Sequence, residues 1–252
     1  MKTPYSQFPW HKLYKSDSLI DEFYENGYIV IRLDGVDYDE IISYTNRYLA
    51  DDRYNRVYDG WKTSKFVKSL ATHNYVVRII NRLYDKECFP FQTLNFMYGT
   101  EQPVHSDMIH FNSLPQHYMC GAWVALENCE HDNGPLIVYP GSHRLPYFSL
   151  ELIGLSPTEH GNKAEFDELR AKYETKISEF CKCLPDPKTI LLKKGECIIW
   201  AANLLHGGSA ILDKKKTRYS QVTHYYFSGC KYYTPWFSNK SSIYYTTPSV
   251  IS

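Results

Sequence analysis

Residues 189–202 read TILLKKGECIIWAA, with β-branched and aromatic residues on both sides of a Lys-Gly turn signal. Four further segments have the same character: FQTLNFMY (91–98), MCGAWVALEN (119–128), PLIVYP (135–140) and RYSQVTHYYF (218–227). Such residues favour strands, and turn-forming residues separate the segments. A series of short strands with few helices between them predicts a mainly β fold, either a sandwich or a barrel.

Helical patterns flank this series of strands. The segment DSLIDEFYEN (17–26) predicts a short helix that Asp17 or Ser18 caps and Gly27 ends. Further helices are expected near 38–50, near 69–84 and over 163–183, and a strand is expected over 28–33. We expect the early helices to pack outside the β structure. The last helix is expected to be an insertion between two strands, over the mouth of the barrel.

The length of the chain, 252 residues, suits one domain over 1–252. Within it, residues 1–89 are expected to hold the N-terminal helices and a leading strand. Residues 90–227 form the β core, with a helical insertion near 145–188, and residues 228–252 form a tyrosine-rich extension. Hydrophobic residues make up 43% of the chain, which is enough for an ordinary globular core.

Charge and composition narrow the classes of partner. The 28 basic residues match the 28 acidic ones, and this zero balance argues against a nucleic-acid or membrane-surface partner. No run approaches the length of a membrane span, which is about 18 apolar residues. No signal peptide is visible, and seven cysteines are too sparse for a disulfide scaffold. We therefore expect a cytoplasmic protein without a nucleic-acid or membrane partner. The sequence leaves its oligomeric state open.

The candidate chemical centre is His105-Ser106-Asp107. On an extended backbone, residues two apart point to the same face, so the imidazole and the carboxylate can reach one ion. This ligand pair suits a divalent metal such as Fe(II), Mn(II) or Zn(II). Taken alone, the tripeptide is better explained by a loop histidine that is hydrogen-bonded to the nearby aspartate, so the rest of the chain has to decide.

Two later segments supply that context. His206 follows the apolar run CIIWAANLL and precedes Gly207-Gly208, where a turn would place it on a rim. If 218–227 is a strand, Arg218, Ser220 and His224 point to one face. An inward arginine is costly unless it meets an anion, and its planar fork matches a carboxylate. The sequence thus offers two histidines, one aspartate and a separate carboxylate clamp, as in the facial triad of non-haem Fe(II) oxygenases.

At this point the chain resembles the phytanoyl-CoA dioxygenase family of Fe(II)- and 2-oxoglutarate-dependent oxygenases. The matching segments are VHSDMIHF (104–111), GAWVALENCEHDNGPLIVYPGSHR (121–144), and KKGECIIWAANLLHGGS with TRYSQVTHY within 193–225. The resemblance implies a double-stranded β-helix, that is, a cupin-like jelly-roll. It also implies the cofactors Fe(II), 2-oxoglutarate and O2. The role of each site residue follows from the same resemblance: His105, Asp107 and His206 ligate iron, Arg218 and Ser220 bind the distal carboxylate of 2-oxoglutarate, and Trp123 and Gln92 line the co-substrate site.

The expected activity is hydroxylation of a C–H bond in a small metabolite, with release of succinate and CO2. Two other hypotheses remain: a cupin-type metal-binding jelly-roll without 2-oxoglutarate chemistry, and a halogenase on the same scaffold. Halogenases replace the carboxylate ligand by Ala or Gly, so Asp107 argues against the second. His110 and His224 are further candidates, with a ligand contact and a structural role both open. Substrate specificity is expected to lie in the N-terminal helices, the 145–188 insertion and the last 25 residues.

Overall fold

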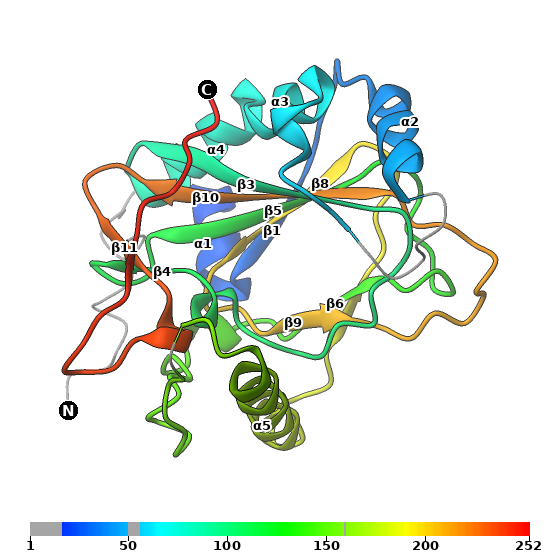
Figure 1. Ribbon diagram of the computed structural model, residues 1–252. Helices are drawn as coiled ribbons and strands as arrows, with labels where there is room; N and C mark the ends of the chain where they lie inside the picture. Colours follow the sequence, from blue (N-terminus) through cyan, green and yellow to red (C-terminus); the bar gives the residue numbers. More distant parts are fainter. Residues whose placement is uncertain (1–16, 50–55, 159) are drawn as a thin grey trace.

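The computed structural model describes residues 17–49, 56–158 and 160–252. Its main antiparallel sheet has the strand order β1-β8-β5-β10-β3-β2. These strands are β1 (Tyr28–Arg32), β8 (Glu196–Ala201), β5 (Met119–Ala125), β10 (Ser220–Phe227), β3 (Cys88–Phe96) and β2 (Val57–Tyr58). A smaller sheet, ordered β7-β6-β9, lies below it in Figure 1. Its strands are β7 (Lys188–Ile190), β6 (Leu136–Val138) and β9 (His206–Gly208). The mainly β prediction is confirmed.

The main sheet separates two hydrophobic clusters because successive side chains of a strand point to opposite faces. On β8, Cys197, Ile199 and Ala201 belong to the cluster beneath the helices. Ile198 and Trp200 belong to the cluster between the two sheets. Both faces of this strand are therefore buried. This accounts for its nearly continuous apolar sequence.

Four helices cover the outer face of the main sheet (Figure 1). They are α1 (Ser18–Asn26), α2 (Tyr38–Leu49), α3 (Lys65–Ala71) and α4 (Asn74–Tyr84). The predicted ends of α1 are confirmed, since the Asp17 side chain accepts from the Leu19 amide and Gly27 ends the helix at φ 79°. The leading strand β1 pairs along its whole length with β8. The N-terminal part of the chain is thus built into the main sheet.

One predicted helix is wrong in its continuity. The helix expected near 69–84 is two helices, because His73 has an extended backbone, at ψ 117°, and acts as the N-cap of α4. The first of them starts earlier, where the Ser64 hydroxyl accepts from the Val67 amide. The segment 189–202 forms two strands on either side of its Lys-Gly turn signal, since the chain turns at Gly195 and the two halves join different sheets.

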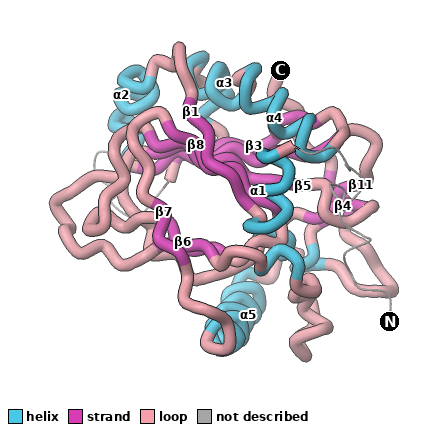
Figure 2. The backbone as a smooth tube through the Cα atoms, turned by 180° about the vertical axis from the view of Figure 1, so that it is seen from behind, coloured by secondary structure: helices cyan, strands magenta, loops and turns pink. Residues whose placement is uncertain are grey.

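The helical insertion is α5 (Lys163–Cys181), which lies on the far side of the smaller sheet from the main sheet (Figure 2). Its buried face, which includes Leu169, Tyr173 and Ile177, packs in one cluster with Trp236. That tryptophan is in the short 3-10 helix η6 (Pro235–Phe237) of the C-terminal extension. This extension also carries β11 (Lys231–Tyr233) and β12 (Tyr245–Thr246), which pair with each other, and β11 pairs with β4 (Asn112–Leu114). None of the described helices is long and apolar enough to cross a bilayer.

Candidate metal and co-substrate site

Three predicted ligands converge between the two sheets. The ligand atoms of His105, Asp107 and His206 all lie within 4.8 Å of one another, and the three residues are buried. The backbones of the two histidines are paired directly: the His105 amide donates to the His206 carbonyl at 2.9 Å, and the reverse bond is 3.0 Å. Asp107 begins the 3-10 helix η4 (Asp107–Ile109), which turns its carboxylate toward both rings.

Backbone carbonyls orient both imidazoles. Nδ1 of His105 lies 2.9 Å from the Pro103 carbonyl, and Nδ1 of His206 lies 2.9 Å from the Leu204 carbonyl. A carbonyl only accepts, so each Nδ1 carries the proton and each Nε2 keeps its lone pair. These lone pairs face Asp107, with Nε2 to Oδ1 distances of 3.6 Å and 3.7 Å. Oriented nitrogen donors beside a carboxylate are the ligand set of a divalent transition metal.

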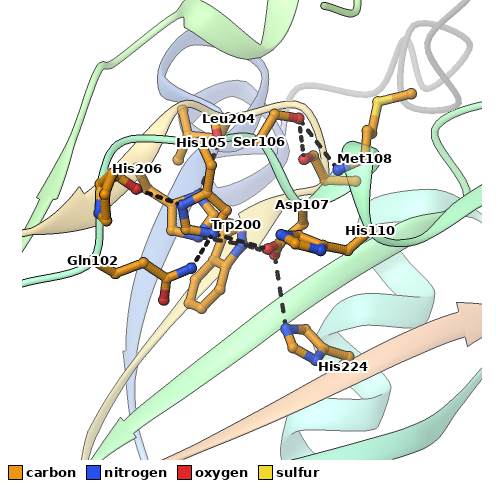
Figure 3. Close-up of polar contacts among 12 residues, drawn as sticks. Gln102, His105, Ser106, Asp107, Met108, His110, Trp200, Leu204, His206 and His224 are labelled. Atoms are coloured by element: carbon orange, nitrogen blue, oxygen red, sulfur yellow. Dashed lines mark hydrogen bonds and ion pairs between the residues drawn. The ribbon is translucent and has the colours of Figure 1, made fainter. Parts of the chain in front are cut away.

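The second carboxylate oxygen of Asp107 has a different environment (Figure 3). The indole N–H of Trp200 donates to Oδ2 at 2.8 Å, and Nε2 of His224 lies 3.8 Å from the same oxygen. The amide of Gln102 lies 3.1 Å from Nε2 of His105, where a bound metal ion would replace that hydrogen bond.

Protonation states match a metal site. Burial lowers the pKa of His206 to about 4, so this ring is neutral at neutral pH. Burial on its own would raise the pKa of the Asp107 carboxyl. His206, His105 and His224 together hold that pKa below its usual range instead, so the carboxylate is ionised. Neutral imidazoles and an ionised carboxylate are the forms that bind metal.

A cavity of about 210 Å³ opens onto the three ligands. Its wall includes residues from both sheets and from α5. The wall also includes the side chains of Gln92, Trp123, Arg218, His224 and His110.

Arg218 reaches this cavity from two residues before β10, as the alternation predicted. Its Nη1 donates to the Gly134 carbonyl at 2.6 Å, while its Nε and the buried Ser220 hydroxyl have no hydrogen-bond partner among the described residues. Burial lowers the pKa of Arg218 to about 10, which leaves it charged at neutral pH. A buried cation beside an unpaired hydroxyl fits a ligand that brings its own carboxylate.

The other predicted co-substrate residues lie on the same inner face. The Trp123 ring stacks under the Arg218 guanidinium at 5.3 Å. Gln92 is paired across the sheet with His224, and its Oε1 lies 2.9 Å from Nδ1 of His224. His224 is thus close both to Gln92 and to Asp107, on the metal side of the cavity.

His110 lies beside the triad, with its ring centroid 5.9 Å from that of His105. The indole N–H of Trp236 donates to its Nδ1 at 3.0 Å. An indole nitrogen can only donate, so Nδ1 of His110 accepts, and the neutral ring carries its proton on Nε2. Burial lowers the pKa of His110 to about 3, which keeps it neutral. The ring therefore offers the cavity a hydrogen-bond donor.

Two features of the site differ from the sequence prediction. The expected turn at Gly207-Gly208 is part of β9. A side chain at Gly207 would come 2.9 Å from the Gln102 carbonyl, so these glycines admit the crossing chain of residues 101–104. Trp200 was not predicted as a site residue. Alternation along β8 gives its inward direction, but nothing in the sequence indicates that its N–H meets Asp107.

Comparison with known proteins gives the family. A model of the phytanoyl-CoA dioxygenase (PhyH) family matches residues 23–218. The chain belongs to this family. Peroxisomal phytanoyl-CoA dioxygenase of Rattus norvegicus is 25% identical over 142 residues, which cover 53% of this chain and 36% of the rat protein. The Bos taurus protein of the same name is 36% identical over 47 residues, 19% of this chain and 14% of the bovine one. The chain thus matches about a third or less of the length of these relatives.

Solved structures share the fold. The non-heme alpha ketoglutarate dependent carbocyclase SnoK from nogalamycin biosynthesis aligns with a TM-score of 0.67 at 14% identity, over 88% of this chain and 87% of SnoK. The epimerase SnoN from the same biosynthesis gives 0.62 at 20%, over 85% and 83%. EctD from S. alaskensis with 2-oxoglutarate and 5-hydroxyectoine gives 0.61 at 19%, over 95% and 82%. The predicted jelly-roll is confirmed.

Proposed function

We propose that this protein is an Fe(II)- and 2-oxoglutarate-dependent oxygenase. The observation that carries the proposal is one cavity lined both by three potential metal ligands and by the buried Arg218. His105, Asp107 and His206 present three metal-ligand atoms within 4.8 Å. Arg218 and Ser220 present a buried cation and an unpaired hydroxyl on the adjacent strand. The EctD structure that contains 2-oxoglutarate shares this fold, which supports the same co-substrate here.

In this proposal the three ligands hold Fe(II) by one face. The iron, when bound, supplies the reduction of O2 that is coupled to decarboxylation of 2-oxoglutarate. Arg218 binds the distal carboxylate of 2-oxoglutarate as a bidentate partner, and the Ser220 hydroxyl donates to it. Trp123 supports the guanidinium from its other side. Burial of all these groups excludes water from the reacting centre.

We infer that the reaction is hydroxylation of a C–H bond in a small molecule. The substrate C–H, 2-oxoglutarate and O2 become C–OH, succinate and CO2. The cavity that opens onto the three ligands would hold the co-substrate together with the reacting part of the substrate. Nε2–H of His110 faces this space and donates to an oxygen of the substrate. The related SnoN and SnoK are an epimerase and a carbocyclase, so the fold also supports other outcomes.

The two other hypotheses explain the site less well. A cupin-type jelly-roll without 2-oxoglutarate has no use for a charged, fully buried Arg218 with a free Nε beside an unpaired Ser220. A halogenase needs a halide where the carboxylate ligand stands. Here Asp107 fills that position and accepts a hydrogen bond from Trp200.

Turnover with labelled oxygen tests the proposal. Purified protein with Fe(II) and 2-oxoglutarate is expected to form succinate slowly without a prime substrate, and faster when a metabolite mixture contains the substrate. Under ¹⁸O2, mass spectrometry should then find one labelled oxygen in the succinate and one in the product. Asp107→Ala is the control, and it should form no succinate. Succinate formation by metal-free protein would contradict the oxygenase assignment. A product without labelled oxygen would contradict hydroxylation but leave the oxygenase assignment standing.

A further inference from the structure

We infer that Trp200, seated on Gly121, is a positioning residue that keeps the Asp107 carboxylate to one metal-facing oxygen. This inference rests on the proposed metal centre and adds to it a pair of residues that are not among its three ligands. The two oxygens of the Asp107 carboxylate have different partners. Oδ1 faces the Nε2 atoms of both ligand histidines, at 3.6 Å and 3.7 Å, while Oδ2 faces the indole N–H at 2.8 Å.

The hydrogen bond to Trp200 is strong for its kind. It joins an ionised acceptor to a buried donor, and such charge-assisted bonds are roughly twice as strong as neutral ones. An indole N–H has no other role than donation, and no other acceptor for it is recorded among the described residues. Rotating Oδ2 toward a metal ion would break this bond inside the protein. The carboxylate would therefore hold a metal ion through Oδ1 alone.

Gly121 explains how the indole reaches this place. Gly121 on β5 lies directly opposite Trp200 on β8 in the main sheet. A Cβ atom at position 121 would lie 2.4 Å from Cζ2 and 2.9 Å from Nε1 of the indole. The backbone of Gly121 is not in the left-handed region, so the glycine is needed for space alone. The missing side chain lets the indole lie flat on β5 with its N–H toward Asp107.

Cobalt binding tests the inference without a substrate. The probe is Co(II) alone, titrated into metal-free full-length protein, because its visible spectrum reports both affinity and coordination number. Trp200→Phe keeps an aromatic ring but removes the donor. We expect about 10- to 100-fold weaker Co(II) binding, as for other partners that orient metal ligands. We also expect a changed band shape, as Oδ2 becomes free to coordinate. Gly121→Ala, which displaces the indole, should shift both readouts in the same direction.

The matched control is Trp61→Phe, which alters a tryptophan of the short 3-10 helix η3 (Gly60–Lys62), outside the lining of the cavity. It should leave both the Co(II) affinity and the spectrum unchanged. Equal affinity and spectrum in the parent and Trp200→Phe would overturn the positioning role and leave the metal centre standing. If the parent itself bound no Co(II), the metal centre would fail as well. If Trp200→Phe does not fold, Gly121→Ala decides in the same way, with the melting temperature of the metal-free protein as the check on folding.

Discussion

At the scale of single residues, Arg218 separates co-substrate binding from metal binding. Its Nε and the Ser220 hydroxyl are buried and unpaired, which is costly in a folded protein unless a ligand completes them. The metal ligands belong to other segments of the chain, so the two functions can be disturbed independently.

We predict that Arg218→Ala weakens 2-oxoglutarate binding and leaves metal affinity nearly unchanged. Removing one partner of a buried charge pair costs about 2–5 kcal/mol. At about 1.4 kcal/mol per tenfold, this is about a 30-fold to several-thousand-fold loss. Arg218→Lys should be intermediate, because a point charge cannot reproduce the bidentate fork. Calorimetric titration of 2-oxoglutarate into Zn(II)-loaded protein measures the effect. Parent-like binding by Arg218→Ala would remove the co-substrate role of this residue.

The sequence located much of this site but not all of it. Alternation along 218–227 placed Arg218 and His224 on the inner face, and the HxD spacing placed His105 with Asp107. Both placements depend only on strand geometry, which local sequence carries. The bond from Trp200 to Asp107 joins residues 93 positions apart and depends on space at Gly121. Side-chain packing across strands settles such a contact, and no local pattern records it.

At the scale of secondary-structure elements, the end of α1 packs directly against the side chain of His143. Gly27 has φ 79°, and a Cβ atom there would lie 2.4 Å from Nδ1 of His143. Nε2 of His143 lies 2.9 Å from the Tyr24 carbonyl, which is in α1. The end of α1 and the His143 ring are therefore in close contact. Burial lowers the pKa of His143 to about 3.

We predict that Gly27→Ala destabilises the protein strongly. The left-handed backbone costs a residue with a side chain about 1–2 kcal/mol, and the clash with His143 adds about 1–3 kcal/mol. Gly35→Ala is the matched control, because Gly35 has φ 72° but nothing within 4 Å of an added Cβ. It should cost only the backbone part. Urea unfolding of both variants measures the difference, and equal losses would show that contact with His143 contributes nothing.

Element boundaries show where local patterns stop being sufficient. The cap and the end of α1 were predicted because Asp17 and Gly27 are local signals. The break between α3 and α4 was missed because Thr72-His73 carries neither proline nor glycine. The helices there separate because each packs its own face into the cluster between the helices and the main sheet, Val67 and Leu70 from α3 and Val76 and Ile80 from α4. Tertiary packing overrode a continuous helical pattern.

At the scale of the whole molecule, metal binding should stabilise the fold. The paired backbones of His105 and His206 join β9 to the loop before η4, so an ion bound there ties separate parts of the chain together.

We predict that Mn(II) at about 100 times its Kd stabilises the protein by about 2.7 kcal/mol. For a chain of this size, that raises the melting temperature by about 5–11 °C. EDTA should reverse the shift. Asp107→Ala is expected to melt near the metal-free parent with or without Mn(II). Differential scanning calorimetry measures both proteins, and an equal rise in the variant would place the bound ion elsewhere.

The order of strands in the main sheet also bears on how the chain folds as it is synthesised. β10 lies between β5 and β3 and pairs with both, yet it comes last of the three in the chain. From the end of β3 at residue 96 to the start of β10 at residue 220 there are 220 − 96 = 124 residues. At about 5–20 residues per second, the ribosome needs about 6–25 s to make them. Until β10 is made, β3 lacks its neighbour on this side, and so does β5 once its residues 119–125 have been added. Their apolar inner faces stay uncovered until β10 follows Arg218 into place and closes the sheet.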